Sequence, residues 1–229
     1  GPVKLVEIMG RNAGWLTAAA ALARESDDDA PHLLYVPEHP VTLDKLLSDV
    51  DDCVRNKGYC VAAISEGLTA PEGKPLFETD DPVHVDAFGH AAKGNIVDGI
   101  GEAIRASLGI KARIDKPSYL QRSFGELMSA TDREEAYLVG RAAVRAAIAG
   151  ETGKMVTLVR QPTAQYQVDT GLAPLEQVAN AERKLPAEFL KKQGNWVTQA
   201  FIEYARPLIG GPLMTYARLK VFPVAKVTP

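Results

Sequence analysis

The chain has 229 residues and a net charge of −3 at pH 7, and 46% of its residues are hydrophobic. This length fits one large domain or one and a half ordinary domains, and the apolar share is sufficient for a sizeable core. The pI lies near 5.9, no apolar run approaches membrane-spanning length and the N-terminus shows no secretory signal, so we expect neither nucleic acid nor a membrane as a partner.

The first element is a short buried strand over residues 4–9, which turns at Gly10 into a helix that runs to residue 23 almost without charge. A strand followed by glycine and a helix N-terminus presents free backbone N–H groups to an anion. Arg11 stands at this turn, and its guanidinium suits phosphate oxygens. The alternative is an ordinary strand-to-helix turn with a solvated arginine, because single glycine turns are common.

Two further strands follow at short intervals. A second strand is predicted over residues 32–36, where Pro37 ends it, and a third over residues 59–65. Between them, apolar residues at helical spacing predict a helix that Thr42 caps and Gly58 stops. The order strand, helix, strand, helix, strand predicts a parallel sheet with right-handed crossovers.

The middle of the chain is predicted to contain a long loop, a helix and a fourth strand. Residues 67–90 are rich in proline and aspartate and indicate an exposed loop, which in a compact domain tends to be functional or mobile. A helix over residues 93–108 is stopped by Gly109, and residues 110–115 form the fourth strand. A proline-led loop over residues 116–123 follows.

The last third begins with the clearest helix of the chain, for which Thr131 and Glu134 form a capping-box pattern. A fifth strand is predicted over residues 155–159, and beyond it the pattern becomes irregular. We expect a further short strand at residues 166–168 and short helices, the best of them at residues 195–205.

Several polar residues fall near the carboxyl ends of these strands, where open parallel sheets bind their ligands. Arg11 follows the first strand, Glu66 follows the third, Tyr119 and Arg122 follow the fourth, and Arg113 lies within the fourth. Arginines, a carboxylate and a helix N-terminus suit a phosphorylated sugar better than a metal or a base edge. Each residue also has a structural interpretation: the two later arginines as surface charges, the glutamate as a cap and the tyrosine as a packing residue.

Other candidate residues are assigned structural roles. Cys53 and Cys60 lie too close in sequence to suggest a long-loop disulfide and have no metal-ligand companions, so we expect reduced core residues of a cytoplasmic protein. The four histidines have neither metal-ligand spacing nor a paired nucleophile. Trp15 and Met155 are expected in the core, and residues 27–29 are expected to form a solvated helix exit.

The segments that carry the polar residues resemble those of the phosphofructokinases. Glu7 to Arg11 resembles their Met-Gly-Arg segment, Ile64 to Gly67 their substrate-binding glutamate segment, and Lys111 to Ser123 their second phosphate-arginine segment. Residues 174–180 and 194–198 are similar to the pyrophosphate-dependent branch rather than to the short bacterial ATP-dependent enzymes. The resemblance covers nearly the whole chain.

The resemblance implies a kinase-like transferase of glycolysis that reversibly moves a phosphoryl group from pyrophosphate to O1 of fructose 6-phosphate, giving fructose 1,6-bisphosphate, in the cytoplasm and with Mg²⁺. Its chemistry is mostly alignment and charge neutralisation. The family builds its sugar pocket across a dimer interface, so we expect a homo-oligomer with a shared site. The implied roles are Met9, Gly10 and Glu66 on the sugar, Arg11 as a substrate-binding and catalytic residue facing the transferring phosphoryl group, Tyr119 and Arg122 on the 6-phosphate, and Arg113 in the neighbouring subunit's site.

The chain departs from the family pattern in what precedes Met9. The family's glycine-rich donor loop, magnesium-binding aspartate and catalytic aspartate all lie before that segment, so Mg²⁺ is expected to bind residues of the parent enzyme that are not in this chain. Pro2 stands where the family has a second subunit-crossing arginine, Gly1 and Pro2 look like a cloning remnant, and Tyr119 stands where the ATP enzymes have histidine. We therefore expect the C-terminal, substrate-binding half of such an enzyme, inactive alone because no general base for the sugar hydroxyl remains.

The implied fold is α/β, a Rossmann-like three-layer sandwich with a mostly parallel sheet, plus a C-terminal, partly helical extension that belongs to the other lobe. Residues 1–122 are expected to form the fructose-6-phosphate-binding lobe, and residues 123–229 a segment that returns to the donor-binding lobe together with the extension. The alternatives are the ATP-dependent counterpart and a non-enzymatic sugar-phosphate-binding or regulatory module. We also expect self-association or some disorder, near the cut and in residues 67–90, because half of such an enzyme exposes apolar surface that its other lobe covers.

Overall fold

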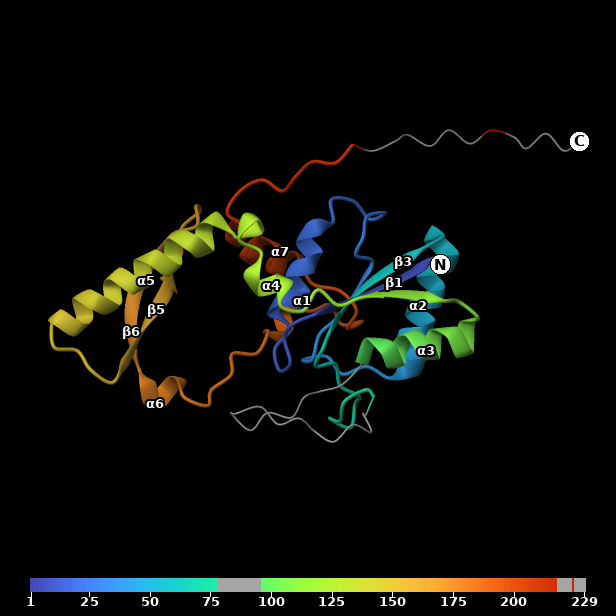
Figure 1. The fold of residues 1–229 in the computed structure, drawn as a ribbon, viewed down its shortest axis with the longest axis horizontal. Coiled ribbons are helices and arrows are strands. Elements are labelled where there is room, and N and C mark those ends of the chain that lie inside the picture. The colour runs from blue at the N-terminus through green and yellow to red at the C-terminus, as the bar shows by residue number, and fades with distance from the viewer. Residues whose placement is uncertain (78–95, 218–223, 225–229) are drawn as a thin grey trace, which may run out of the picture.

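The computed structural model describes residues 1–77, 96–217 and 224, which form a sheet with helices on both faces and an elongated arm (Figure 1). The strands are β1 (Val3–Ile8), β2 (Leu33–Tyr35), β3 (Cys60–Ser65), β4 (Ala112–Asp115), β5 (Lys154–Arg160) and β6 (Val168–Pro174). The α-helices are α1 (Trp15–Ala19), α2 (Leu43–Lys57), α3 (Ile96–Leu108), α4 (Leu120–Ser123), α5 (Ala130–Ile148), α6 (Leu175–Val178) and α7 (Gln199–Ala205). Short 3₁₀ turns are η1 (Ala20–Ala23), η2 (Gly125–Leu127), η3 (Ala187–Phe189) and η4 (Arg206–Ile209).

The first four strands form one parallel sheet in the order β2-β3-β1-β4. In this sheet β1 pairs with β3 along its whole length, from Val3 opposite Cys60 to Ile8 opposite Ser65. The pairing of β1 with β4 is shorter and ends at Asp115. Because all strands run in the same direction, their carboxyl ends lie at one edge. The predicted α/β fold and parallel sheet are confirmed.

The first core lies between one face of this sheet and helices α2 and α3. Its buried side chains alternate along the strands and include those of Leu5 and Tyr35. Helix α2 begins after Thr42, whose hydroxyl accepts the Lys45 N–H at 3.3 Å, and it ends at Gly58, which has a φ of +81°. Both ends of this helix agree with the prediction from the sequence.

The second core covers the opposite face and is built from α1, η1 and the C-terminal segment. Phe201 and Val197 are each 1% exposed and pack with Ala18 and Leu34. The Leu34 N–H also donates to the Asn195 carbonyl at 3.0 Å, so this segment joins the sheet at its β2 edge. This part of the expected C-terminal extension therefore packs against the parallel sheet. Its apolar side chains cover sheet surface that α1, only five residues long, is too short to cover.

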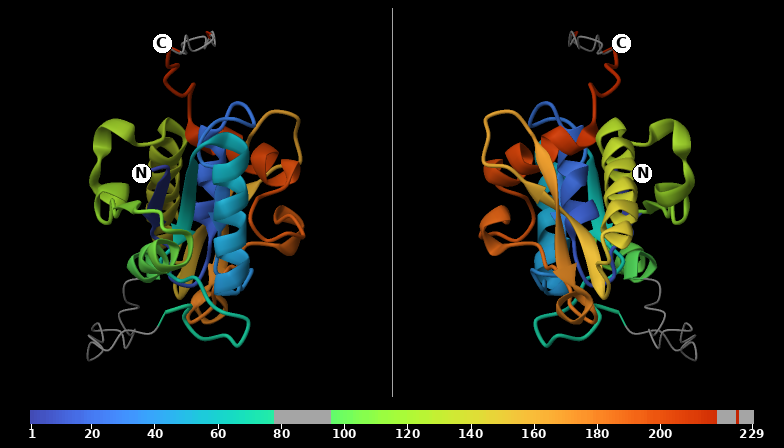
Figure 2. Two further views of the ribbon diagram at one scale, coloured as in Figure 1. Left: turned by 90° about the vertical axis from the view of Figure 1, so that its right-hand side faces the viewer. Right: turned by 90° about the vertical axis from the view of Figure 1, so that its left-hand side faces the viewer.

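The arm consists of α5 and the hairpin of β5 and β6, which lie side by side (Figure 2). The two strands pair in antiparallel fashion and form a sheet of their own. The predicted fifth strand is thus present but does not extend the parallel sheet. The short strand predicted at residues 166–168 instead begins at Val168 and runs to Pro174.

Side chains at the start of α5 bind the arm to η4 in the C-terminal segment. Ser129 donates its hydroxyl to the Leu208 carbonyl at 2.6 Å, and Thr131 donates to the Pro207 carbonyl at 3.1 Å. Ser129 also accepts the Asp132 N–H at 3.1 Å and so caps the helix. The capping box predicted at Thr131 is therefore wrong, because that hydroxyl binds η4 instead.

A few other expectations are changed or lie outside the described residues. The predicted helix start at residue 93 and most of the predicted loop over residues 67–90 cannot be compared, because residues 78–95 lie outside the described part. Met155 is 39% exposed on the hairpin and is not a core residue, whereas Trp15 packs against the second core. In the described parts of the chain, no helix is both long and apolar enough to cross a membrane.

Candidate functional site

Four connections meet at the carboxyl edge of the parallel sheet. β1 leads into a turn over residues 9–14, β2 into Pro37 and Glu38, β3 into Glu66 and Gly67, and β4 leads towards α4. This is the edge at which parallel sheets bind their ligands. The site is therefore built from loops that a rigid sheet holds in place.

Two glycines allow the connections after β1 and β3 to touch. Gly10 has a φ of +138°, and its N–H donates to Oε1 of Glu66 at 3.1 Å while its carbonyl accepts the Ser65 hydroxyl at 2.7 Å. A Cβ on Gly67 would lie only 1.7 Å from the Arg11 carbonyl oxygen, so no larger residue fits there. The structure thus brings Gly10 and Glu66 into direct contact and fixes Arg11 on the same turn.

A third contact joins this turn to the connection after β4. The Met9 N–H donates to Oε1 of Gln121 at 3.1 Å. Tyr119 and Arg122 flank this glutamine, and their side chains make no hydrogen bond or ion pair with described residues; the tyrosine is 73% exposed. Gln121 was missed by the sequence analysis, since a lone glutamine in a loop carries no recognisable signal. It brings the predicted phosphate-binding segment beside Met9.

Arg113 does not join the other predicted site residues within one chain. It lies on the edge strand β4, opposite Lys4 of β1. Because β1 continues four residues further to Ile8, Arg113 lies about 13 Å below the carboxyl edge at a rise near 3.3 Å per residue. Lys4 and Asp115 form an ion pair at 2.5 Å beside it.

A pocket of about 410 Å³ opens beside the turn after β1. The Arg11 guanidinium makes no hydrogen bond or ion pair with a described residue, whereas Lys184 donates to the Asn12 carbonyl at 2.6 Å and pairs with Glu182 at 2.8 Å. A guanidinium without a protein partner can bind phosphate oxygens without first breaking a contact. The lining residues are Arg11, Asn12, Pro37, Glu38, Gly67, Thr69, Lys184 and Leu185.

The cap of the helix at this turn is bound by a carboxylate from another connection. Helix α1 begins only at Trp15, and both carboxylate oxygens of Glu38 accept the Gly14 N–H at 3.0 Å. Glu38 also accepts the Leu185 N–H at 2.8 Å. Of the N–H groups after Gly10, that of Gly14 is therefore occupied by a protein carboxylate. The sequence carried a usable signal for Glu38, because it follows the second predicted strand at the carboxyl edge.

The carboxylates at this edge influence one another. Burial raises the pKa of Glu7 above its usual value of 4.5; the Lys116 ammonium opposes this shift, and the Glu66 and Asp98 carboxylates add to it. Glu7 is the residue of β1 that pairs with Ile64, two positions before Glu66. The carboxylates of Glu7 and Glu66 therefore lie near enough to each other to interact electrostatically.

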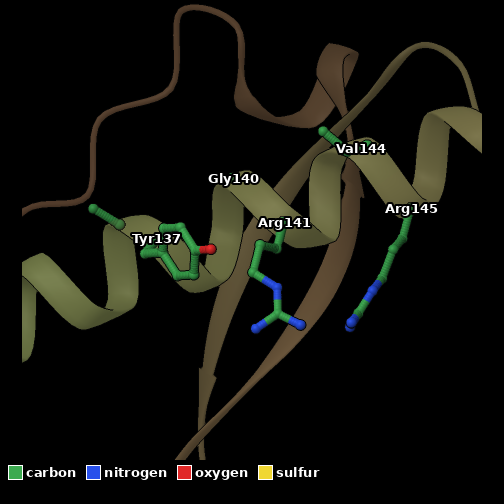
Figure 3. Close-up of a pocket in the computed structure, with 6 residues that line it drawn as sticks. Tyr137, Gly140, Arg141, Val144 and Arg145 are labelled. Atoms are coloured by element: carbon green, nitrogen blue, oxygen red, sulfur yellow. The ribbon is translucent and has the colours of Figure 1, made fainter.

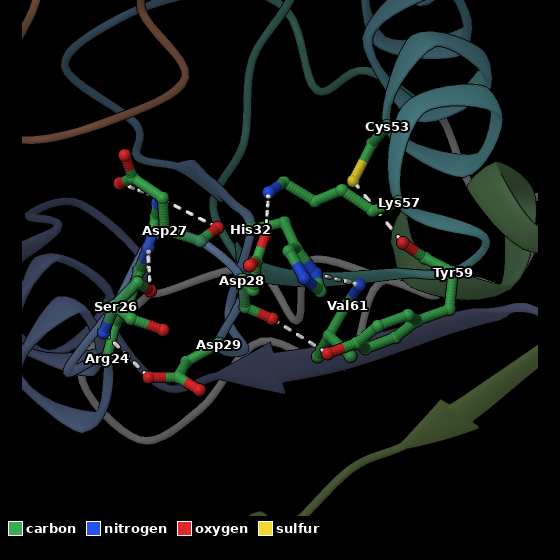
Figure 4. Close-up of polar contacts among 10 residues, drawn as sticks. All are labelled: Arg24, Ser26, Asp27, Asp28, Asp29, His32, Cys53, Lys57, Tyr59 and Val61. Atoms are coloured by element: carbon green, nitrogen blue, oxygen red, sulfur yellow. Dashed lines mark hydrogen bonds and ion pairs between the residues drawn. The ribbon is translucent and has the colours of Figure 1, made fainter. Parts of the chain in front are cut away.

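One group of soft metal ligands exists, at the opposite edge of the sheet. His32, Cys53 and Cys60 each offer one ligand atom, and these atoms lie within 4.8 Å of one another. His32 Nδ1 already accepts the Val61 N–H at 3.0 Å (Figure 4). Burial raises the pKa of both thiols. Cys53 also contacts the Tyr59 carbonyl through its sulfur.

This group does not fit the magnesium ion that the family resemblance implies. Mg²⁺ prefers carboxylate oxygens and water, and among residues 1–77, 96–217 and 224 no other group of three or more possible metal ligands is close enough together.

A second pocket, of about 470 Å³, lies on the arm rather than at the sheet edge. It is formed by one face of α5, where the Arg141 guanidinium lies 5.7 Å from the ring of Tyr137 (Figure 3). Val144, on the same face, is 60% exposed. This face is unpartnered helix surface, and it contains none of the predicted site residues.

Comparison with known proteins identifies the family of the chain. The chain matches the family described as Phosphofructokinase over residues 2–147. It is 39% identical to the pyrophosphate–fructose 6-phosphate 1-phosphotransferase of Xanthomonas campestris pv. campestris (strain B100), over 99% of this chain and 56% of that protein. It is 40% identical to the enzyme of the same name from Rhodospirillum rubrum, over 96% of this chain and 55% of that protein.

The fold agrees as well. The crystal structure of a pyrophosphate-dependent phosphofructokinase from Marinobacter aquaeolei superposes with a TM-score of 0.77 and 35% sequence identity, covering 94% of this chain and 50% of that one. The chain spans about half the length of the relatives that it matches. Sequence, fold and the arrangement at the sheet edge lead to one conclusion: the chain belongs to the phosphofructokinase family.

Proposed function

We propose that this chain forms the sugar-phosphate-binding part of an enzyme that reversibly transfers a phosphoryl group from pyrophosphate to O1 of fructose 6-phosphate. The observation that carries the proposal is the hydrogen bond of 3.1 Å from the Gly10 N–H to Glu66, which joins the Met-Gly-Arg turn to the acidic residue after β3. The names of the relatives at 39% and 40% identity support the same substrates.

Glu66 and Arg11 have complementary roles in this proposal. One oxygen of Glu66 holds Gly10 and the other can accept a sugar hydroxyl, with Met9 and Gly10 forming the adjoining wall. The Arg11 guanidinium faces the transferring phosphoryl group and stabilises charge that grows as the reacting oxygens approach. Its lack of a protein partner among the described residues supports this role.

Tyr119 and Arg122 bind the 6-phosphate of the sugar. Their support is the bond from the Met9 N–H to Gln121, which brings this segment beside the turn that holds the sugar. Both side chains are exposed, so a phosphate can reach them without displacing a protein contact. A guanidinium and a phenolic hydroxyl are suitable donors to phosphate oxygens.

Arg113 serves the neighbouring subunit of a homo-oligomer. Its exposed position on the edge strand β4, away from the Glu66 site of its own chain, supports a site shared across a dimer interface.

The boundary between the two proposed lobes lies shortly before the arm. Residues 1–122 form the fructose-6-phosphate-binding lobe, and the segment from residue 123 through the hairpin returns to the donor-binding lobe. The support is the apolar surface of the arm, where Tyr137 is 70% and Ile148 is 83% exposed. The C-terminal segment that packs on α1 belongs with the first lobe. The same surface supports self-association of the isolated chain.

The donor loop, the catalytic aspartate and the magnesium ligands then belong to the part of the parent enzyme outside this chain. The chain alone is inactive, because the sugar hydroxyl has no general base. We propose a cytoplasmic location for the enzyme. Cys53 and Cys60 support it, since they are free thiols whose sulfurs lie within 4.8 Å of each other.

Assay of the full-length parent and of this chain tests the proposal. The parent is expected to phosphorylate fructose 6-phosphate with pyrophosphate and not with ATP, and the purified chain with neither. Turnover with ATP alone identifies the ATP-dependent counterpart. No turnover by the parent with either donor, together with sugar-phosphate binding, identifies the non-enzymatic module.

A further inference from the structure

The turn after β1 is bound from the far end of the chain by the segment Glu182–Leu185, which we call the C-terminal clamp. Lys184 donates to the Asn12 carbonyl at 2.6 Å, and the Asn12 side-chain amide donates to Glu182. The Trp15 indole N–H donates to the Arg183 carbonyl at 2.8 Å. The clamp therefore binds the turn on both sides of Gly14.

Glu38 links the clamp to the turn from a third segment. Its carboxylate accepts the Gly14 N–H with both oxygens at 3.0 Å and the Leu185 N–H at 2.8 Å. Leu185 is only 3% exposed, so this end of the clamp is anchored in the second core. A Cβ on Gly14 would lie 2.5 Å from Cβ of the buried Val36 and 2.8 Å from Oε2 of Glu38, so this crowded position favours glycine.

These bonds hold the backbone on the downstream side of Arg11. On its upstream side, Gly10 is held by Glu66 and Ser65. On its downstream side, the hold depends on the clamp at Asn12 and on Glu38. An error of about 1 Å in the position of a catalytic group can reduce turnover about 100-fold. The bonds to Asn12 and Gly14 therefore help to fix the backbone position from which the Arg11 side chain extends.

We propose that Glu38 is a positioning residue that locks the C-terminal clamp onto the turn carrying Arg11, and that this lock aligns Arg11 with the transferring phosphoryl group. The alignment step rests on the proposed function, whereas the lock itself does not. Lys184 is the second bond of the same lock, since it joins the clamp to Asn12 directly. Removing either bond loosens both segments together.

Hydrogen–deuterium exchange of this chain tests the lock without any assay of activity. In Glu38→Ala, amide exchange is expected to rise in both residues 9–15 and residues 182–190. Glu38→Gln is expected to lie near the unmodified chain, because its carbonyl can replace Oε1, the oxygen that accepts both N–H groups. Glu188→Ala removes an exposed carboxylate of the same segment that has no contact with described residues, and is expected to change neither peptide. Faster exchange in one peptide only, or in neither, overturns the lock.

If Glu38→Ala does not fold, Lys184→Ala gives the same test from the other bond. In the full-length parent, both substitutions are expected to lower kcat at least 10-fold with less than a 3-fold change in KM for fructose 6-phosphate. The double variant is expected to lose little more than either single one, since both bonds serve one lock. If amide exchange rises in both peptides but kcat of the parent is unchanged, the lock is supported and the proposed alignment of Arg11 is overturned. If the unmodified parent is inactive, the proposed function is contradicted. The exchange experiment still tests the lock, because it does not depend on activity.

Discussion

The Gly10 N–H donates a hydrogen bond of 3.1 Å to Oε1 of Glu66, a residue 56 positions further along the chain. This bond closes the connection after β1 onto the connection after β3 at the carboxyl edge of the sheet. It uses one carboxylate oxygen of Glu66 and leaves the other without a partner among the described residues. An acidic acceptor and the Arg11 guanidinium thereby flank the same turn, and the proposed sugar-phosphate site rests on this arrangement.

Gly67→Ala is expected to disrupt this arrangement. The added Cβ would lie 1.7 Å from the Arg11 carbonyl oxygen, and backbone atoms on both sides leave no simple route for relaxation. Overpacking of this kind costs about 1–3 kcal/mol or more in the free energy of unfolding. Urea unfolding measures the loss, and Gly125→Ala is the control because its Cβ meets nothing within 4 Å. Equal stability of the two variants would contradict the close approach.

Arg122→Ala is expected to weaken the binding of fructose 6-phosphate to the full-length parent by roughly 1.5–3 kcal/mol, the range for a charge-assisted hydrogen bond. The dissociation constant or KM for the sugar measures the effect. Lys192→Ala removes an exposed positive charge that makes no contact with described residues, and it controls for net charge. An unchanged KM in Arg122→Ala counts against its role on the 6-phosphate.

Arg11→Ala is expected to lower kcat of the parent more than it weakens substrate binding. The charge that Arg11 stabilises grows only as the phosphoryl group transfers, so the lost interaction belongs to the transition state. Arg11→Lys keeps one positive charge but not the planar fork, and is expected to recover part of kcat. Steady-state kinetics for both variants decide the question, and an equal loss in kcat and affinity would mean that Arg11 only positions the substrate.

Glu7→Gln is expected to change stability in a pH-dependent way. Burial raises the pKa of Glu7 above 4.5, so the folded chain binds this proton more tightly than the unfolded chain does. As the pH rises through the unfolded-state and then the folded-state pKa of Glu7, ionisation destabilises the folded chain. The stabilisation that the protonated carboxyl gave at low pH is thereby lost. Relative to the unmodified chain, Glu7→Gln becomes more stable as the pH rises from below 4.5 to neutral.

Urea unfolding at an acidic and a neutral pH measures the effect at Glu7. Glu72→Gln, at an exposed carboxylate, is the control and is expected to give the same difference from the unmodified chain at both values. A difference for Glu7→Gln that does not depend on pH is the result that would count against the raised pKa.

The parallel sheet and half of the site could be predicted because their signals are local. Gly58 ends α2 with a left-handed φ, and the strands before Gly10 and Glu66 are continuous apolar runs. Since parallel strands end at one edge, those two residues had to lie close together. The proximity of Gly10 and Glu66 could therefore be predicted without knowing any contact between distant segments.

The rest depends on contacts between segments that local patterns do not connect. Asn12 and Glu182 are 170 residues apart, and the only outward sign of their contact is a lysine-rich, irregular segment. Phe201 enters the second core from a helix of seven residues, too short for a clear periodicity. The pairing of β5 with β6 was not predicted for another reason. Alternating apolar and polar residues predict that a strand forms, but they do not identify the strand with which it pairs.

The most direct test of the central claim is a two-dimensional ¹H–¹⁵N NMR titration of this chain with fructose 6-phosphate. The site described here predicts that the largest shifts fall on the backbone amides of Met9, Gly10, Glu66 and Gln121, and that Glu66→Gln reduces them. Shifts confined to the α5 face around Tyr137 and Arg141, or binding that is unchanged in Glu66→Gln, would contradict it.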